Sequence, residues 1–208
     1  PVWSEQTLTV NGREIPATQN GWQLLRTNAS LPITLSSSMP WQIGFINIER
    51  PGRGVTVSAM GINGAQLSQW SKWRPGMWED LAQTKADLII LAYGTNEAFS
   101  GNLDISSTER TWRNYIRQIK NTLPNAGILI LGAPESLKTA YGSCGNRPVL
   151  LSEVQQMQQR VARDEKIMFW SWQDAMGGAC SMKNWMAQGL GTGAGMGVGR
   201  MIGSSSSA

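Results

Sequence analysis

The sequence contains no histidine, only two cysteines and no long apolar run, and each shortage excludes a class of protein or site. Histidine is the commonest metal ligand in proteins, so its absence argues against a zinc site. No apolar stretch approaches the ~20 residues that cross a bilayer, so we expect no membrane-spanning segment. With 41% hydrophobic residues, the chain is predicted to be a soluble globular protein without a bound cofactor.

Charged residues are also scarce, at 15% of the chain, and basic residues slightly outnumber acidic ones, 18 against 14. The basic residues are scattered, whereas a nucleic-acid-binding patch typically shows as a run of them. We therefore expect no nucleic-acid partner. The small positive charge favours solubility and encounter with an acidic polymer.

Tryptophan is the residue in excess, because the chain has ten, against three phenylalanines and three tyrosines. A tryptophan buries a large apolar area and keeps one polar donor, so core packing is its ordinary role. The flat indole face can also stack on a sugar ring. Four tryptophans are candidates for contact with a glycan: Trp70, Trp73, Trp78 and Trp185.

Cys144 and Cys180 lie in segments with the composition of loops. In an exported protein an even cysteine count favours a disulfide, whereas two unrelated buried thiols are the ordinary expectation for a cytosolic protein. The chain starts at Pro1 without a methionine or a signal-peptide pattern. We expect that processing or truncation has removed an upstream part, so the sequence leaves export open.

Residues 1–54 are predicted to be rich in β-strands. Polar residues alternate with β-branched and other apolar residues over 6–10, 31–35 and 41–46. The dipeptide Asn11-Gly12 favours a tight hairpin turn. A set of only about five short strands predicts an incomplete sandwich or an appendage of a larger domain.

After residue 54 the pattern changes to alternating strands and helices, which predicts an α/β fold with a doubly wound, mostly parallel sheet over residues 55–190. Apolar runs indicate the strands, and apolar residues at helical spacing indicate the helices. The predicted strands are 55–59, 86–92, 128–131 and 167–170. The predicted helices are 66–83, interrupted at Pro75, then 107–123 and 149–165, and a final loop ends the series.

Residues 191–208 differ in composition from the rest. Glycine occupies every second position from Gly191 to Gly199, and four serines stand at 204–207. This composition is typical of linkers. We expect a disordered or non-native tail.

Two loops are predicted at the strand ends, where open α/β sheets bind ligands. They are residues 61–65, Gly-Ile-Asn-Gly-Ala, and residues 93–97, Tyr-Gly-Thr-Asn-Glu. Gly64 would let a backbone N–H approach a substrate oxygen closely, and the Asn96 amide offers a neutral donor. Gly64 and Asn96 could therefore form an oxyanion hole. The alternative is a tight turn beside a helix cap, without a catalytic role.

These segments resemble two sequence blocks of the SGNH, or GDSL-type, hydrolases. Gly94-Thr95-Asn96 is similar to the third block, and residues 61–65 are similar to the second, with Gly64 as its glycine. Together with residues 169–178 they most resemble the peptidoglycan O-acetylesterase branch, which consists of periplasmic enzymes of Gram-negative bacteria. The resemblance implies a periplasmic or secreted ester hydrolase that removes O-acetyl groups from peptidoglycan or another cell-wall glycan. It also implies that residues 1–54 are the end of an inserted carbohydrate-module-like domain.

The chain departs from this family at the blocks that carry the nucleophile and the base. It has no Gly-Asp-Ser segment and no Asp-x-x-His segment. By the resemblance, the first is expected upstream of Pro1 and the second after residues 185–190. A serine without an adjacent base is a poor nucleophile, so a non-catalytic carbohydrate-binding relative remains an alternative. A carboxylate pair for glycoside cleavage, Glu97 with Asp174, is another.

Overall fold

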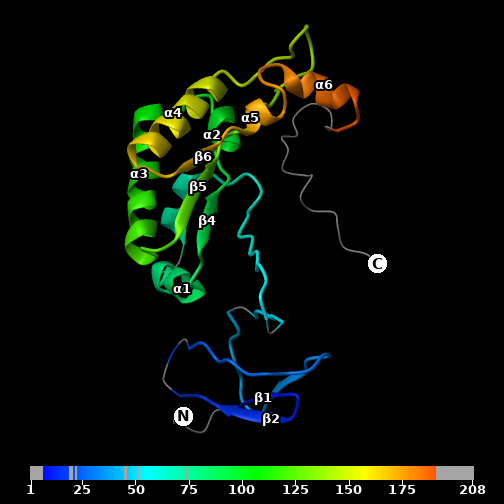
Figure 1. The fold of residues 1–208 in the computed structure, drawn as a ribbon, viewed down its shortest axis with the longest axis vertical. Coiled ribbons are helices and arrows are strands. Elements are labelled where there is room, and N and C mark those ends of the chain that lie inside the picture. The colour runs from blue at the N-terminus through cyan, green and yellow to red at the C-terminus, as the bar shows by residue number, and fades with distance from the viewer. Residues whose placement is uncertain are drawn as a thin grey trace. The chain divides into compact units, whose positions relative to one another are not determined.

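The computed structural model describes residues 7–18, 21, 23–44, 46–50, 52–73 and 75–190. The chain divides into two compact units, residues 1–58 and 59–208, and Figure 1 follows the course of each. The predicted glycine- and serine-rich tail, residues 191–208, lies outside the described residues.

The first unit contains a small antiparallel sheet. β1 (Thr7–Val10) and β2 (Arg13–Pro16) form a hairpin, and β3 (Leu35–Ser37) pairs with the other side of β1. Asn11 and Gly12 both have positive φ, 48° and 79°, in the hairpin turn, as the Asn-Gly dipeptide predicts. Strand content in this part of the chain is thereby confirmed.

Three strand predictions are corrected by the structure. β3 begins only at Leu35, and the described part of 41–46 contains no strand. Residues 55–59 are also irregular, with Val55 and Val57 91% and 85% exposed. A strand exists only through hydrogen bonds to a neighbouring strand. An alternating pattern was insufficient here because these segments have no ladder partner among the described residues.

The second unit is an α/β domain built on a parallel sheet. β4 (Leu88–Leu91), β5 (Gly127–Leu131) and β6 (Met168–Trp170) pair in that order. Parallel neighbours require crossover connections, which contain α3 (Ile105–Thr122) and α4 (Leu151–Asp164). The predicted α/β class and parallel sheet are confirmed.

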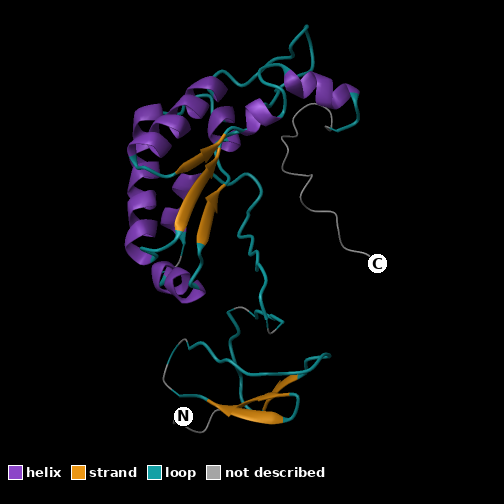
Figure 2. Cartoon of the chain, viewed as in Figure 1, coloured by secondary structure: helices purple, strands orange, loops and turns teal. Residues whose placement is uncertain are grey.

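Helices α3 and α4 pack against each other and cover one face of this sheet (Figure 2). Strand side chains point alternately to the two faces. Leu91 and Ile130 are 1% and 0% exposed, whereas Leu88, Ile90 and Trp170 are 45–51% exposed. The side chains on the helix-covered face therefore form the core, and the other face is more open in the described part of the chain.

Helix α3 shows how the sequence fixes a core element. The Asp104 carboxylate accepts hydrogen bonds from Ser106 N and Ser107 N, at 2.9 and 3.2 Å, and so caps the helix. Trp112, Ile116 and Ile119 recur at helical spacing and are fully buried. Burying each of them contributes roughly 1.5–3 kcal/mol, so packing more than local propensity stabilises α3.

Shorter elements surround the ends of the strands. The predicted helix 66–83 is two elements, the 3-10 helix η2 (Leu67–Lys72) and α1 (Met77–Thr84), and α2 (Thr95–Phe99) follows β4. The predicted final loop contains α5 (Trp172–Ala175) and α6 (Ser181–Ala187). Both are too short for periodicity to indicate a helix. No helix in the described ranges combines the length and apolar content that a membrane span requires.

Candidate active site

The two loops predicted to carry the site meet beyond the carboxyl end of β4. Asn96 Nδ2 donates a hydrogen bond to the Ala65 carbonyl oxygen at 2.8 Å. In return, Gln66 Nε2 donates to the Asn96 carbonyl oxygen at 3.3 Å. The structure thus brings Asn96 against the residue that directly follows Gly64.

Gly64 presents a backbone N–H at an open position. It lies in a turn closed by a hydrogen bond from Ala65 N to Ile62 O at 3.1 Å, and its φ is 79°. This left-handed conformation favours glycine. A Cβ at Gly64 would meet no atom within 4 Å, and its N–H has no partner among the described residues. The donor is therefore available to a substrate oxygen.

Asn96 supplies a second donor beside it. The side chain is exposed at the start of α2. A carboxamide has two N–H bonds, and Ala65 accepts only one of those of Asn96. Two neutral donors that reach the same oxygen can stabilise a developing oxyanion.

The buried Glu97 side chain links the two loop regions through hydrogen bonds. It is 2% exposed, and its carboxylate oxygens accept hydrogen bonds from Leu67 N and Gly94 N, each at 2.9 Å. Burial raises the pKa of Glu97, while the backbone hydrogen bonds oppose part of this rise. The backbone N–H groups of Leu67 and Gly94 thus offset only part of the cost of burying this carboxylate.

Gln158 of α4 extends this buried polar network, and the sequence analysis missed it. The side chain is 0% exposed, donates to Tyr93 O at 2.7 Å and accepts from Ala133 N at 2.8 Å. It therefore ties the segments that follow β4 and β5. A Cβ at Gly94, whose φ is 118°, would lie 2.6 Å from Gln158 Nε2. The available signal was a pair of glutamines, Gln155 and Gln158, on the otherwise apolar buried face of α4.

The candidate tryptophans have different surroundings. Trp70 donates from Nε1 to the Tyr93 hydroxyl at 2.9 Å, and its ring stacks on Trp73 at 5.0 Å between centroids. Trp78 contacts Trp70 edge-on and packs with it against the core. Trp185 packs against a separate small cluster and donates to Met176 O at 3.0 Å. Trp73 is the half-buried tryptophan that borders a cavity without joining the core.

That cavity lies beside the Gly64 turn. Its volume is about 250 Å³. Residues from the turn, from η2 and from the end of β4 line it, among them Ile62, Ala65, Gln69, Trp70, Lys72 and Trp73. Ala65 borders the cavity and also accepts the Asn96 hydrogen bond. The cavity therefore borders the loop that carries Gly64, although neither Gly64 nor Asn96 is among the described residues that line it.

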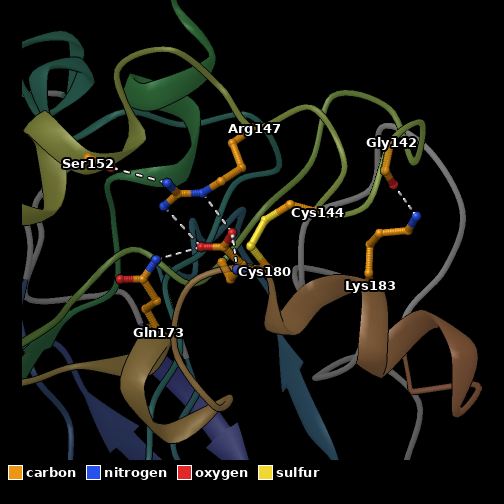
Figure 3. Close-up of a disulfide and its surroundings, with 8 residues drawn as sticks. Gly142, Cys144, Arg147, Ser152, Gln173, Cys180 and Lys183 are labelled. Carbon is orange, nitrogen blue, oxygen red and sulfur yellow. Dashed lines mark hydrogen bonds and ion pairs between the residues drawn. A yellow bond between two sulfur atoms is a disulfide. The ribbon is translucent and has the colours of Figure 1, made fainter.

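A second buried carboxylate, Glu135, lies after β5 and is 0% exposed. It forms an ion pair with Arg147, with Nε 2.7 Å from Oε1, and accepts hydrogen bonds from Gln173 Nε2 at 2.6 Å and Cys180 N at 3.2 Å. Cys180 is joined by a disulfide to Cys144, with Cα atoms 4.8 Å apart. Figure 3 shows Arg147 and Gln173 converging beside this disulfide. The cluster fastens the loop after β5 to α5 and α6.

The glycosidase alternative is not supported by these positions. Both oxygens of Glu97 accept backbone hydrogen bonds inside the protein, so this carboxylate is not presented to a ligand. Asp174 is exposed on α5 and makes no contact with Glu97 among the described residues.

The chain is similar to one protein family and to several solved structures. Residues 43–190 match the model of the GDSL-like lipase/acylhydrolase family. Among solved structures, a peptidoglycan O-acetylesterase is 66% identical, with a TM-score of 0.84, over 91% of this chain and 54% of that protein. The chain thus spans about half the length of this relative.

Other solved structures are more distant. An acetyl xylan esterase is 12% identical over 62% of each chain, with a TM-score of 0.48. An acetylxylan esterase from Geobacillus stearothermophilus is 15% identical over 54% of this chain and 52% of its own, with a TM-score of 0.42. No curated protein matches the chain.

Proposed function

The chain belongs to the GDSL-like lipase/acylhydrolase family, and on this premise we propose that it forms the oxyanion-hole part of an esterase that removes O-acetyl groups from peptidoglycan. The observation that carries the proposal is the hydrogen-bonded pair of loops that presents free donors at Gly64 and Asn96. The 66% identity to a peptidoglycan O-acetylesterase supports the choice of substrate.

In this reaction the ester carbonyl oxygen becomes negative when the nucleophile attacks. Gly64 N–H and the free Asn96 Nδ2–H donate hydrogen bonds to that oxygen. Because both donors are neutral, they would stabilise charge that develops in the transition state without a change of protonation. Losing one such donor typically costs on the order of 10² to 10³ in rate.

The nucleophile and the base are assigned to parts of the protein outside these 208 residues. The sequence has no histidine and no Gly-Asp-Ser segment. In the proposed mechanism a serine hydroxyl attacks the acetyl carbon, and a histidine accepts its proton and passes it to the departing sugar oxygen. Water then hydrolyses the acetyl-serine with the same histidine as base.

The proposed substrate also indicates a location and a role for the first unit. Peptidoglycan lies outside the cytoplasmic membrane, so we assign the protein to the periplasm or the exterior. The Cys144–Cys180 disulfide fits such an oxidising compartment. Residues 1–54 would then be the end of an inserted carbohydrate-module-like domain, and Trp73 the tryptophan best placed to touch the glycan.

The test is release of acetate from O-acetylated peptidoglycan by the protein carrying its natural flanking sequence. We expect acetate from this substrate and none from peptidoglycan whose O-acetyl groups were first removed with mild alkali. A folded, extended protein that releases no acetate would contradict the proposal. If that protein still bound the glycan saturably, the non-catalytic carbohydrate-binding relative would replace it.

A further inference from the structure

The Gln158 side chain lies at the junction between the segments that follow β4 and β5. Its Nε2 donates a hydrogen bond to the Tyr93 carbonyl oxygen at 2.7 Å, and its Oε1 accepts one from Ala133 N at 2.8 Å. A carboxamide has its donor on one atom and its acceptor on another, so these two partners impose a single orientation on it. Because the side chain is 0% exposed, bulk water cannot replace either bond.

The backbone of Gly94 lies directly against this carboxamide. A Cβ at Gly94 would lie 2.6 Å from Gln158 Nε2 and 3.0 Å from Ala133 Cβ, so the close approach requires glycine. Gly94 N donates a hydrogen bond to Glu97 Oε2 at 2.9 Å. The peptide group between Tyr93 and Gly94 is therefore fixed at both polar ends, with its carbonyl held by Gln158 and its N–H held by Glu97.

This peptide group immediately precedes α2, the short helix that carries Asn96. Gly94 is the N-cap of α2, and its carbonyl oxygen accepts a hydrogen bond from Ala98 N at 2.9 Å. Asn96 lies two residues after this cap and belongs to the first turn of the helix. A rotation of the peptide group would therefore turn α2 and move the Asn96 carboxamide.

We propose that Gln158 is a positioning residue for ester hydrolysis, which orients Asn96 through the peptide group of Tyr93 and Gly94 without touching the substrate. The proposal rests on the proposed esterase activity and extends its machinery to a buried residue of α4. The role requires a side chain that donates to one carbonyl oxygen and accepts from one N–H. Among side chains of this length, glutamine and protonated glutamic acid meet the requirement.

Gln158→Glu tests this requirement through the pH dependence of kcat for 4-nitrophenyl acetate. A protonated carboxyl group can donate to Tyr93 O and accept from Ala133 N, whereas a carboxylate has no donor. Burial should raise the pKa of the introduced group, and ionised Glu97 should raise it further, so we expect it to titrate between about pH 6 and 9. The kcat of the extended protein, divided by the wild-type kcat at the same pH, should fall about tenfold to a hundredfold over this range, with little change in KM.

Gln155→Glu is the matched control. Gln155 is 8% exposed on the same buried face of α4, and its Nε2 donates to Ala133 O at 2.8 Å. Within the described ranges it makes no hydrogen bond to Tyr93 or Gly94, so its relative kcat should not depend on pH. A relative kcat of Gln158→Glu that stays constant with pH, or an equal fall in Gln155→Glu, would overturn the proposal.

Hydrogen exchange of the Gly94 amide separates failure of this assignment from failure of the esterase proposal, because it needs no ester. We expect this amide to exchange at least about tenfold faster in Gln158→Glu above the pKa of the new group than in Gln155→Glu, since its peptide group has lost one of two anchors. Equal exchange in the two variants would overturn the assignment, whether or not the wild type cleaves an ester. Faster exchange in a protein that cleaves no ester would contradict the esterase proposal and keep Gln158 as the residue that orients α2.

Discussion

Glu97 and Glu135 are both almost fully buried carboxylates that follow strands of the parallel sheet, yet their surroundings differ. Glu135 has a cation, Arg147, within 2.7 Å. Glu97 has none in the described part of the chain, where its oxygens accept hydrogen bonds from the backbone N–H groups of Leu67 and Gly94. The carboxylate of Glu135 is thus neutralised by a cationic side chain, whereas that of Glu97 is stabilised only by backbone hydrogen bonds within the described residues.

The difference shows that the protein buries a carboxylate without a counter-charge at Glu97, in the described part of the chain. A buried charge without a counter-charge is unfavourable, and burial accordingly raises the pKa of Glu97. Groups with perturbed pKa values are enriched at functional sites. We interpret Glu97 as the residue that positions the oxyanion loops and Glu135 as the anchor of the disulfide-linked loop after β5.

The largest loss in the free energy of unfolding is expected for Glu135→Gln. It leaves Arg147 without its counter-charge. Breaking a fully buried ion pair costs about 3–5 kcal/mol, and we expect the lower end of this range because the Arg147 side chain is 25% exposed. Urea denaturation should show this loss in the free energy of unfolding, while kcat per folded molecule stays unchanged. Glu153→Gln, at an exposed residue of α4, is the control. A loss no larger than that of the control would remove the distinction between the two carboxylates.

Glu97→Gln should have a smaller effect on stability and a larger one on activity. An amide nitrogen would face the N–H of Leu67 or Gly94 and leave a buried donor unpaired, at a cost of about 1–3 kcal/mol, offset in part because a buried charge is removed. The loops would shift, and a shift of about 1 Å can cost up to 10²-fold in rate. Steady-state kinetics should show the loss mainly in kcat. Unchanged kcat in a folded variant would contradict a positioning role.

The pH dependence of the free energy of unfolding should distinguish the wild type from Glu97→Gln. Because the pKa of Glu97 is raised in the folded state, its protonated form favours folding. Its contribution is fully present below the unfolded pKa and is lost as pH rises through the folded pKa. The stability of the wild type minus that of Glu97→Gln should therefore fall between mildly acidic and neutral pH. Equilibrium unfolding across this range measures it, and a difference that rises with pH would contradict the assignment.

The smallest loss of stability is expected at the partly exposed ion-pair network between α3 and α4. Hydrogen bonds from Arg160, and then from Arg113, hold the pKa of Glu109 below its ordinary value. Its contribution is therefore present above the unfolded pKa and lost as pH falls through the folded pKa, opposite in sign to that of Glu97. Glu109→Gln should cost about 0.5–1 kcal/mol near pH 7. Unfolding at acidic pH should show the loss disappearing, and a loss that grows there would contradict it.

The sequence predicted the parts of the molecule that depend on local pattern. The apolar run at 86–92 contains β4, and the loops around Gly64 and Asn96 do meet. It could not show that Glu97 is buried under both loops or that Gln158 bridges two strand ends, because these contacts join residues far apart in the chain. The strand predicted at 55–59 failed for the same reason, since strands depend on a partner and not on composition alone.

The most direct test of the central claim is the kcat for 4-nitrophenyl acetate of the extended protein and of its Asn96→Ala variant. Asn114→Ala, at an exposed position of α3 whose side chain forms no hydrogen bond with the described residues, serves as the matched control. We predict that Asn96→Ala lowers kcat by about 10² to 10³ with little change in KM, while Asn114→Ala retains the wild-type kcat. Equal kcat values for the two variants, both folded, would contradict an oxyanion hole at Gly64 and Asn96.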